Sequence, residues 1–199
     1  MIPLVYPHID LIGAIAYLLF RMYKKTKGNS LGIIGMKGAG KTTFYNKLGL
    51  LGNDGGGTYK TPYNQRNIKI GDRDIKIASG EDIGGGENFI IDQTYEKWFS
   101  EKDIIIFIFD ISKYCQNENY SDQTNARLSY IYNRFKAKKK TDFENVVIVA
   151  SHADQFKISY KEFRNILGEK EYNKLFENNF FLADLTDDKS FNSIIKTIF

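Results

Sequence analysis

A mostly parallel α/β sheet flanked by helices is the fold class that the sequence predicts, and three observations indicate it. An apolar, β-branched run over 31–34 is followed at once by a glycine-rich loop and then by a helical pattern. Two further runs, 103–112 and 145–151, are long and apolar enough to be buried central strands. Helical patterns separate these runs, and such alternation is typical of parallel sheets covered by helices.

The remaining elements are expected in the following order. The segment 42–51 has a helical pattern, and 52–65 is glycine-rich and polar, which predicts a mobile loop. The run 66–79 alternates apolar and polar residues about a Gly-Asp pair, which predicts a β-hairpin. Three further helices are expected over 124–137, 160–167 and 190–199, and a last strand over 180–184.

Length and composition fit one globular domain with an N-terminal extension. The chain has 199 residues, of which 42% are hydrophobic and 26% charged, and a sizeable core is therefore expected. The single cysteine, Cys115, excludes an intramolecular disulfide and fits a reducing compartment. The net charge is only +4. The basic run 134–140 could be a patch for anionic lipid or nucleic acid, but a solvated helix end is the favoured interpretation. Nucleic acid is therefore not an expected partner.

Residues 1–30 form a segment of their own ahead of a domain over 31–199. The first twenty residues carry almost no charge and precede four basic ones, which favours a membrane helix with the domain on the cytoplasmic side. Pro7 and Asp10 argue against a simple span. Residues 1–25 also have a narrow polar stripe, so they could instead lie in the membrane interface, dock on a partner protein or pack on the domain. The expected location is the cytoplasmic face of a membrane.

The loop at 35–42 has the spacing G-x-x-x-x-G-K-[ST] of a phosphate-binding P-loop. Its glycines permit a tight turn, and its backbone N–H groups would cradle phosphate oxygens. Lys41 is expected to reach the β- and γ-phosphates, and the Thr42 hydroxyl to bind Mg²⁺. The nucleotide-binding residues expected here are Gly35, Lys37, Gly38, Ala39, Gly40, Lys41, Thr42 and Thr43.

From Leu31 to Phe199 the order of motifs resembles that of the Ras-like small GTPases. The pattern is closest to the Arf branch and to the β-subunit of the signal-recognition-particle receptor. The resemblance rests on the P-loop and on four later motifs: a threonine in the loop 52–65, DIGGG at 82–86, ASHAD at 150–154 and LADLT at 182–186. It implies a P-loop G domain that binds GTP or GDP with Mg²⁺. It also implies a protein partner that reads loops reordered when GTP replaces GDP, here 53–65 and 83–92.

The resemblance assigns the metal and γ-phosphate contacts to particular residues. DIGGG is similar to the D-x-G-G-Q switch of Arf-like proteins, so Asp82 would hold Mg²⁺ through a water and Gly85 would donate its N–H to the γ-phosphate. Thr61, twenty residues after Lys41, would bind Mg²⁺ and sense the γ-phosphate. Thr58 is the alternative for that role.

The same resemblance implies that the base is guanine. Asp154 matches the aspartate of N-K-x-D, whose carboxylate accepts hydrogen bonds from N1 and from the exocyclic amine of guanine. Ser151 and His152 replace the asparagine and the lysine of that motif, and a histidine ring could still stack on the purine. Ala183 and Asp184 lie where the family offers backbone N–H groups to guanine O6.

Hydrolysis is the part of the resemblance that this sequence fits least. Gly86 stands where the family has a water-positioning glutamine, so turnover is expected to be slow or partner-assisted. Glu87 is the alternative catalytic group. A nucleotide-loaded scaffold that does not hydrolyse is one alternative function. A P-loop ATPase or kinase is a second.

Overall fold

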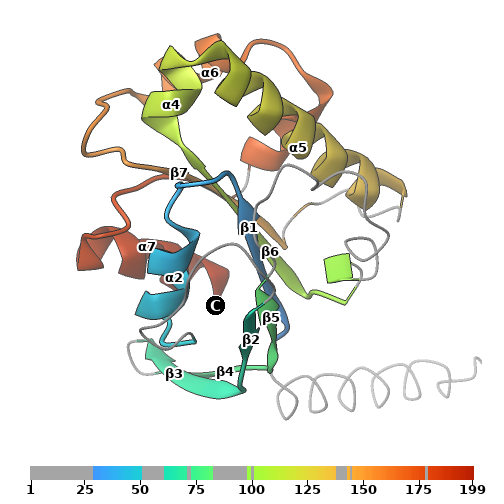
Figure 1. Cartoon of the computed structure of the whole chain (residues 1–199), viewed down its shortest axis with the longest axis vertical. Coiled ribbons are helices and arrows are strands. Elements are labelled where there is room, and N and C mark those ends of the chain that lie inside the picture. Colours follow the sequence, from blue (N-terminus) through green and yellow to red (C-terminus); the bar gives the residue numbers. More distant parts are fainter. Residues whose placement is uncertain are drawn as a thin grey trace, which may run out of the picture.

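A four-stranded parallel sheet forms the centre of the computed structural model (Figure 1). Its strands lie in the order β1 (Leu31–Gly35), β6 (Ile104–Asp110), β7 (Val146–Ser151) and β8 (Phe180–Leu182). The predicted fold class, α/β with a mostly parallel sheet, is thus confirmed. The structure describes residues 29–50, 61–70, 73–82, 98–99, 101–137, 143, 145–177 and 179–199.

The central strands are the most buried part of this sheet. Every residue of β1, β6 and β7 is buried, as expected for parallel strands covered on both faces, which read as continuous apolar runs. Phenylalanine rings extend the core beyond the sheet: the ring of Phe163 lies 6.0 Å from that of Phe109 and 5.2 Å from that of Phe180. This continuous burial explains why these strands could be predicted from sequence.

Four shorter strands form one long antiparallel hairpin. They are β2 (Thr61–Tyr63), β3 (Arg66–Ile70), β4 (Arg73–Ile77) and β5 (Gly80–Asp82). β3 pairs with β4, and β2 with β5. Thr61 lies opposite Asp82 and Arg66 opposite Ile77, so both ladders keep a single register. The predicted hairpin is confirmed, and it is longer than expected.

The hairpin lies against the outer edge of β1. Asn29 forms a parallel bridge with Ile77, in which its N–H donates to the Lys76 carbonyl at 2.9 Å and its carbonyl accepts from the Ala78 N–H at 3.0 Å. The Tyr63 hydroxyl donates to the Leu31 carbonyl at 2.6 Å. The prediction of a mobile loop is therefore wrong for residues 61–63, because Tyr63 is only 3% exposed and anchors them to β1. Residues 51–60 lie outside the described residues.

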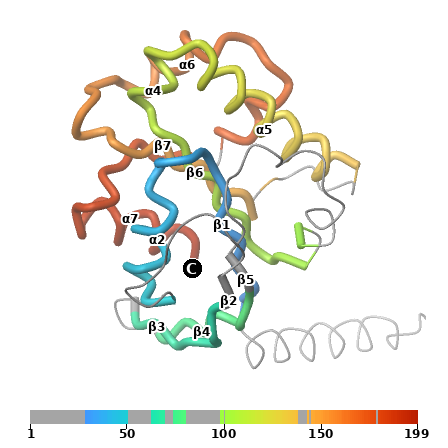
Figure 2. Tube along the Cα trace, in the orientation of Figure 1, coloured from blue at the N-terminus to red at the C-terminus, as the bar shows by residue number. Residues whose placement is uncertain are grey.

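Helices cover the sheet on both faces (Figure 1). α2 and α7 lie together on one side and α5 on the other, and Figure 2 shows α2 and α7 adjacent although they come from opposite ends of the described chain. Their contact includes the rings of Phe44 and Phe191, with centroids 4.9 Å apart. The helices are α2 (Lys41–Lys47), α4 (Ile111–Gln116), α5 (Glu118–Ala137), α6 (Tyr160–Leu167), the 3₁₀ helix η1 (Glu171–Phe176) and α7 (Asp188–Ile198).

Helix ends differ from the predictions where a local capping motif was overlooked. α2 ends at Lys47 instead of Leu51, because Gly49 has a φ of +65° and the N–H of Leu50 donates back to the Tyr45 carbonyl at 3.0 Å. This reversal is a common way for a helix to end at glycine. α5 begins at Glu118 instead of 124, because the Asn117 side chain accepts the Tyr120 N–H at 2.9 Å.

The predicted membrane segment cannot be compared with the structure, because residues 1–28 lie outside the described residues. None of the helices within the described residues has both the length and the apolar character needed to cross a membrane.

Candidate functional site

Four strand ends meet at one edge of the sheet. Gly35 ends β1 opposite Ile108, Asp110 ends β6 opposite Ser151, and Leu182 ends β8 opposite Ala150. Since all four strands are parallel, the loops that follow them lie at the same edge. This edge is where ligands of open α/β sheets bind, and it carries the motifs that the sequence singled out.

The loop after β1 depends on two of its glycines. A Cβ on Gly35 would lie 1.9 Å from the carbonyl oxygen of Ile108, and its φ is +150°. A Cβ on Gly40, whose φ is +90°, would lie 2.9 Å from Cδ1 of Leu185. Both positions thus combine a backbone conformation that favours glycine with a close neighbour. Lys37 and Gly38, at the tip of the loop, are exposed.

The side chain of Lys41 turns back over this loop. Its Nζ donates to the Met36 carbonyl at 2.8 Å and to the Gly35 carbonyl at 3.2 Å. Lys41 opens α2 directly after Gly40, which provides no side-chain cap. The helices α4, α6 and α7 begin differently, with Asp110, Ser159 and Asp187 capping a backbone N–H. α2 thus starts with the ammonium of Lys41 turned toward the loop and, among the described residues, without a side-chain cap.

A buried arginine also contacts this loop. Arg127 of α5 is 5% exposed, and its Nη1 donates to the Gly35 carbonyl at 3.2 Å. Sequence reasoning missed this residue. The available signal was its place beside Leu128 and four residues before Ile131, which puts a charge on the apolar face of the helix.

The expected metal ligands come from α2 and the hairpin. Thr42 is the second residue of α2 and is partly exposed. Thr61 and Asp82 are directly opposite each other at the end of the hairpin. As residue types, threonine and aspartate offer oxygen atoms of the kind that Mg²⁺ binds. The expected positions Thr58, Gly85, Gly86 and Glu87 lie outside the described residues.

The loop after β7 begins with a strained residue. His152 has a φ of +59°, which is uncommon for a residue other than glycine. Its Nδ1 lies 3.0 Å from the Ser151 hydroxyl and 3.6 Å from Oδ2 of Asp110. Ser151 is 1% exposed, and its hydroxyl donates to the Phe109 carbonyl at 3.0 Å. Ser151 therefore supports the loop from inside the sheet, while Asp154, two residues after His152, is exposed.

The loop after β8 packs beside the loop after β7. The N–H of Ala183 donates to the Ala150 carbonyl at 2.9 Å, and its carbonyl accepts from the Ala153 N–H at 3.3 Å. The Ala183 N–H could donate to a base only if it left the Ala150 carbonyl. Asp184 accepts from the hydroxyl and the N–H of Thr186, both at 2.7 Å, and these bonds hold its pKa below the usual range.

A lysine that sequence reasoning missed joins the β8 loop to α2. Nζ of Lys47 donates to the Thr186 carbonyl at 2.8 Å and pairs with the Asp188 carboxylate at 2.7 Å. Together with the approach of Leu185 to Gly40, this contact fixes the β8 loop against the start of α2.

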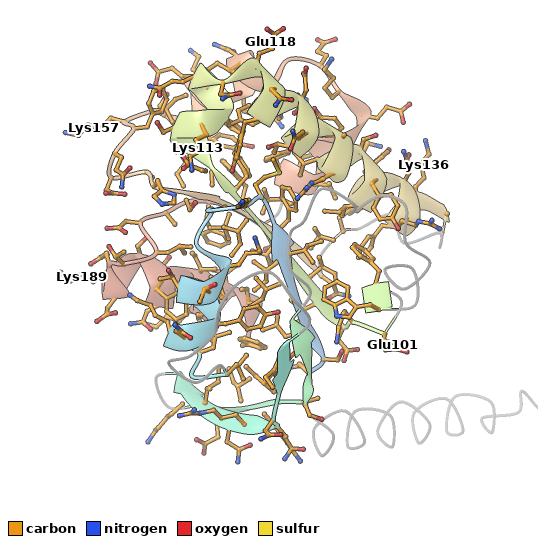
Figure 3. The ribbon with its side chains drawn as sticks, viewed as in Figure 1. Glu101, Lys113, Glu118, Lys136, Lys157 and Lys189 are labelled. Atoms are coloured by element: carbon orange, nitrogen blue, oxygen red, sulfur yellow. The ribbon has the colours of Figure 1, made fainter. Side chains whose placement is uncertain are left out.

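A second missed lysine, Lys113, lies over the loop after β1 (Figure 3). Its Nζ is 3.3 Å from Oδ2 of Asp110, and it is the nearest atom, at 3.4 Å, to the position that a Cβ on Gly38 would take. The edge thus gathers Lys41, Lys113 and Arg127 around one loop.

Neither the scan of family models nor the search of curated proteins finds a match for this chain.

Proposed function

We propose that residues 31–199 are a guanine-nucleotide-binding domain of the Ras-like P-loop type. The observation that carries this proposal is the position of Lys41, whose ammonium lies 2.8 Å and 3.2 Å from two carbonyls of the glycine-rich loop. A lysine held inside a loop of this spacing is positioned to bind a phosphate group. The hairpin beside β1 supports the Ras-like topology, since Asn29, two residues before β1, forms a parallel bridge with Ile77 of β4.

Phosphate binding would replace the bonds of Lys41 to the two loop carbonyls with bonds to an anion. The ammonium now donates to the neutral carbonyl oxygens of Gly35 and Met36. A phosphate oxygen carries a negative charge, so its hydrogen bond to an ammonium also gains the attraction between opposite charges. Gly38 and Gly40 have no side chains, so phosphate oxygens could approach their backbone N–H groups closely.

Guanine is the base that the loop after β7 fits. The Asp154 carboxylate is exposed at the carboxyl end of the sheet and accepts hydrogen bonds only. Guanine presents two neighbouring donors, N1–H and the exocyclic amine, to such a group, whereas adenine does not. His152 would lie along the purine, and its left-handed backbone sets the direction in which the loop leaves β7.

Mg²⁺ would be held by Thr42, with Asp82 and Thr61 from the hairpin. When bound, the ion neutralises charge on the phosphates. Gly86 has no side chain to orient water, so slow or partner-assisted hydrolysis is proposed. The proposal also includes a membrane association through residues 1–25 at the cytoplasmic face, and a protein partner that distinguishes the GTP form from the GDP form.

The direct test is nucleotide binding by the full chain after removal of bound nucleotide. Isothermal titration with GDP, GTP and ATP in the presence of Mg²⁺ should show guanine nucleotides binding at least about tenfold tighter than ATP, because a buried donor or acceptor left unpaired costs about 1–3 kcal/mol. Lys41→Met should abolish binding. Lys189→Met removes an exposed lysine of α7 and is the charge-matched control that should bind normally. Equal or tighter ATP binding would contradict the proposal.

Phosphate release from GTP separates the two guanine-binding alternatives. Slow release that Gly86→Gln accelerates would indicate a switch with hydrolytic activity. Tight binding without release would indicate a nucleotide-loaded scaffold.

A further inference from the structure

We propose that Lys113 is a phosphate-binding residue of the same site. Its ammonium would contact a phosphate oxygen of the nucleotide at the tip of the β1 loop. The proposal rests on the proposed function and adds a residue that neither the P-loop spacing nor the later motifs contain. Figure 3 shows Lys113 on α4, above the β1 loop.

The position of the ammonium is the first argument. Nζ of Lys113 is the only neighbour within 4 Å of the Cβ position built on Gly38, among the described residues. Gly38 is exposed and has a φ of +72°. A bound phosphate in this loop would therefore have two lysines nearby, Lys41 from α2 and Lys113 from α4.

The way in which Lys113 is held is the second argument. Asp110 is 5% exposed, its Oδ1 accepts the backbone N–H of Lys113 at 3.1 Å, and its Oδ2 lies 3.3 Å from Nζ. The carboxylate thus fixes both ends of the lysine. The Lys113 side chain nevertheless remains 52% exposed, and an ammonium has three donors. It can therefore bind an anion while it keeps its contact with Asp110.

Asp110 also connects this lysine to the loop that would read the base. The same Oδ2 atom lies 3.6 Å from Nδ1 of His152, the residue that follows β7. Lys113 and His152 therefore share one carboxylate, with Lys113 close to Gly38 of the β1 loop and His152 at the start of the loop that contains Asp154. A nucleotide that bound both loops would pass beside the Lys113 ammonium.

A purely structural role for Lys113 is the competing explanation. In that case the pair with Asp110 only stabilises the start of α4, and its loss would affect unfolding but not nucleotide binding. Lys136 provides a matched comparison, because it pairs with Glu171 at 3.4 Å on the surface, with side chains 59% and 74% exposed. Lys136 is at the far end of α5, away from the β1 loop (Figure 3).

The test compares Lys113→Met, Lys113→Arg and Lys136→Met in the full chain. GDP binding is measured by titration calorimetry at several salt concentrations. Lys113→Met should weaken GDP binding about three- to fivefold, the size expected for an exposed charge pair, and should reduce the dependence of affinity on salt. Lys113→Arg keeps the charge and should bind GDP within about twofold of the unaltered chain. Lys136→Met should leave both affinity and salt dependence unchanged.

Two results would overturn the proposal in distinguishable ways. If the unaltered chain binds GDP and Lys113→Met binds it equally well at every salt concentration, Lys113 is structural and the proposed function stands. If the unaltered chain binds no guanine nucleotide, the proposed function fails and this inference fails with it.

Discussion

Arg127 and Gly35 are joined by a hydrogen bond between residues 92 positions apart in the chain. Nη1 of the buried guanidinium donates to the Gly35 carbonyl at 3.2 Å, and Nζ of Lys41 donates to the same oxygen, also at 3.2 Å. A carbonyl oxygen has two lone pairs and can accept both. If Lys41 moved to a phosphate, Arg127 would keep this carbonyl satisfied, and the β1 loop would retain its shape.

Replacement of Arg127 should therefore affect stability and binding together. Arg127→Met removes a hydrogen bond from a charged, buried donor, and the free energy of unfolding should fall by about 2 kcal/mol. GDP binding should also weaken, because departure of Lys41 would then leave the Gly35 carbonyl without either donor. Urea denaturation and calorimetric titration measure the two effects. Lys136→Met, at the exposed end of the same helix, should change stability by less than about 0.5 kcal/mol. An Arg127→Met chain as stable as the unaltered one would contradict this role.

Replacement by alanine should lower the free energy of unfolding much more at Gly35 than at Gly168. A Cβ on Gly35 would lie 1.9 Å from the Ile108 carbonyl oxygen, which belongs to β6 and cannot move without breaking the sheet. We expect Gly35→Ala to cost more than about 3 kcal/mol of unfolding free energy, or to prevent folding. Gly168 has a φ of +65° and no neighbour within 4 Å of its Cβ position among the described residues. With a ψ of −166°, this glycine is in a backbone region that other residues rarely adopt, and Gly168→Ala should cost about 1–3 kcal/mol from that strain alone. Equal losses in urea denaturation would refute the difference.

Local patterns were sufficient to predict the centre of the fold. Continuous apolar runs marked β6 and β7, and the segment 160–167 was predicted with its exact bounds as α6. The spacing of the β1 loop is also local, and its strand-loop-helix context was correct. Contacts between distant segments were not predictable in this way. The burial of Tyr63 against Leu31, which orders residues 61–63, depends on pairing across the hairpin and cannot be deduced from a glycine-rich stretch.

The same limit applies to the candidate site. Its residues were chosen by their position within motifs, but their orientation depends on neighbouring strands. The Ser151 hydroxyl bonds to Phe109 on β6, and the Ala183 N–H bonds to Ala150 on β7. Lys113 and Arg127 come from helices outside every motif, so only the assembled sheet edge brings them to the β1 loop.

Two buried tyrosines form a matched pair for a stability test. The hydroxyl of Tyr114 donates to Oδ1 of Asn125 at 2.8 Å, whereas the hydroxyl of Tyr172 is buried without a hydrogen-bond partner among the described residues. Tyr114→Phe should lower the free energy of unfolding by about 1 kcal/mol, since it removes a formed bond. Tyr172→Phe should raise it by about 1 kcal/mol, since it removes an unsatisfied polar group. Urea denaturation of both variants checks the opposite signs, and a loss of stability in Tyr172→Phe would show that its hydroxyl is satisfied in solution.

Tyr172 also predicts how stability changes at alkaline pH. Burial raises the pKa of Tyr172 from its ordinary value of 10.0 to about 12. The folded chain therefore keeps this proton at a pH where the unfolded chain has released it. The titration of this group therefore leaves the free energy of unfolding unchanged well below pH 10 and lowers it as the pH rises from about 10 toward 12. Denaturation midpoints between pH 9 and 11 should fall less in Tyr172→Phe than in the unaltered chain, and parallel declines would contradict the assignment.

Asp154 gives the sharpest prediction about the base. Asp154→Asn replaces one acceptor oxygen with an amide donor, so one of the two guanine donors would face another donor. GDP binding should weaken by about ten- to a hundredfold, the cost of an unpaired polar group in a binding site. Xanthosine diphosphate carries a carbonyl in place of the exocyclic amine, and the new amide could donate to it, so its binding should improve. Because Asp154 is exposed, the variant should unfold at the same urea concentration as the unaltered chain. Asp122→Asn, an exposed change on α5, is the control that should alter neither affinity. Unchanged preference for GDP in Asp154→Asn would exclude this carboxylate as the group that reads the base.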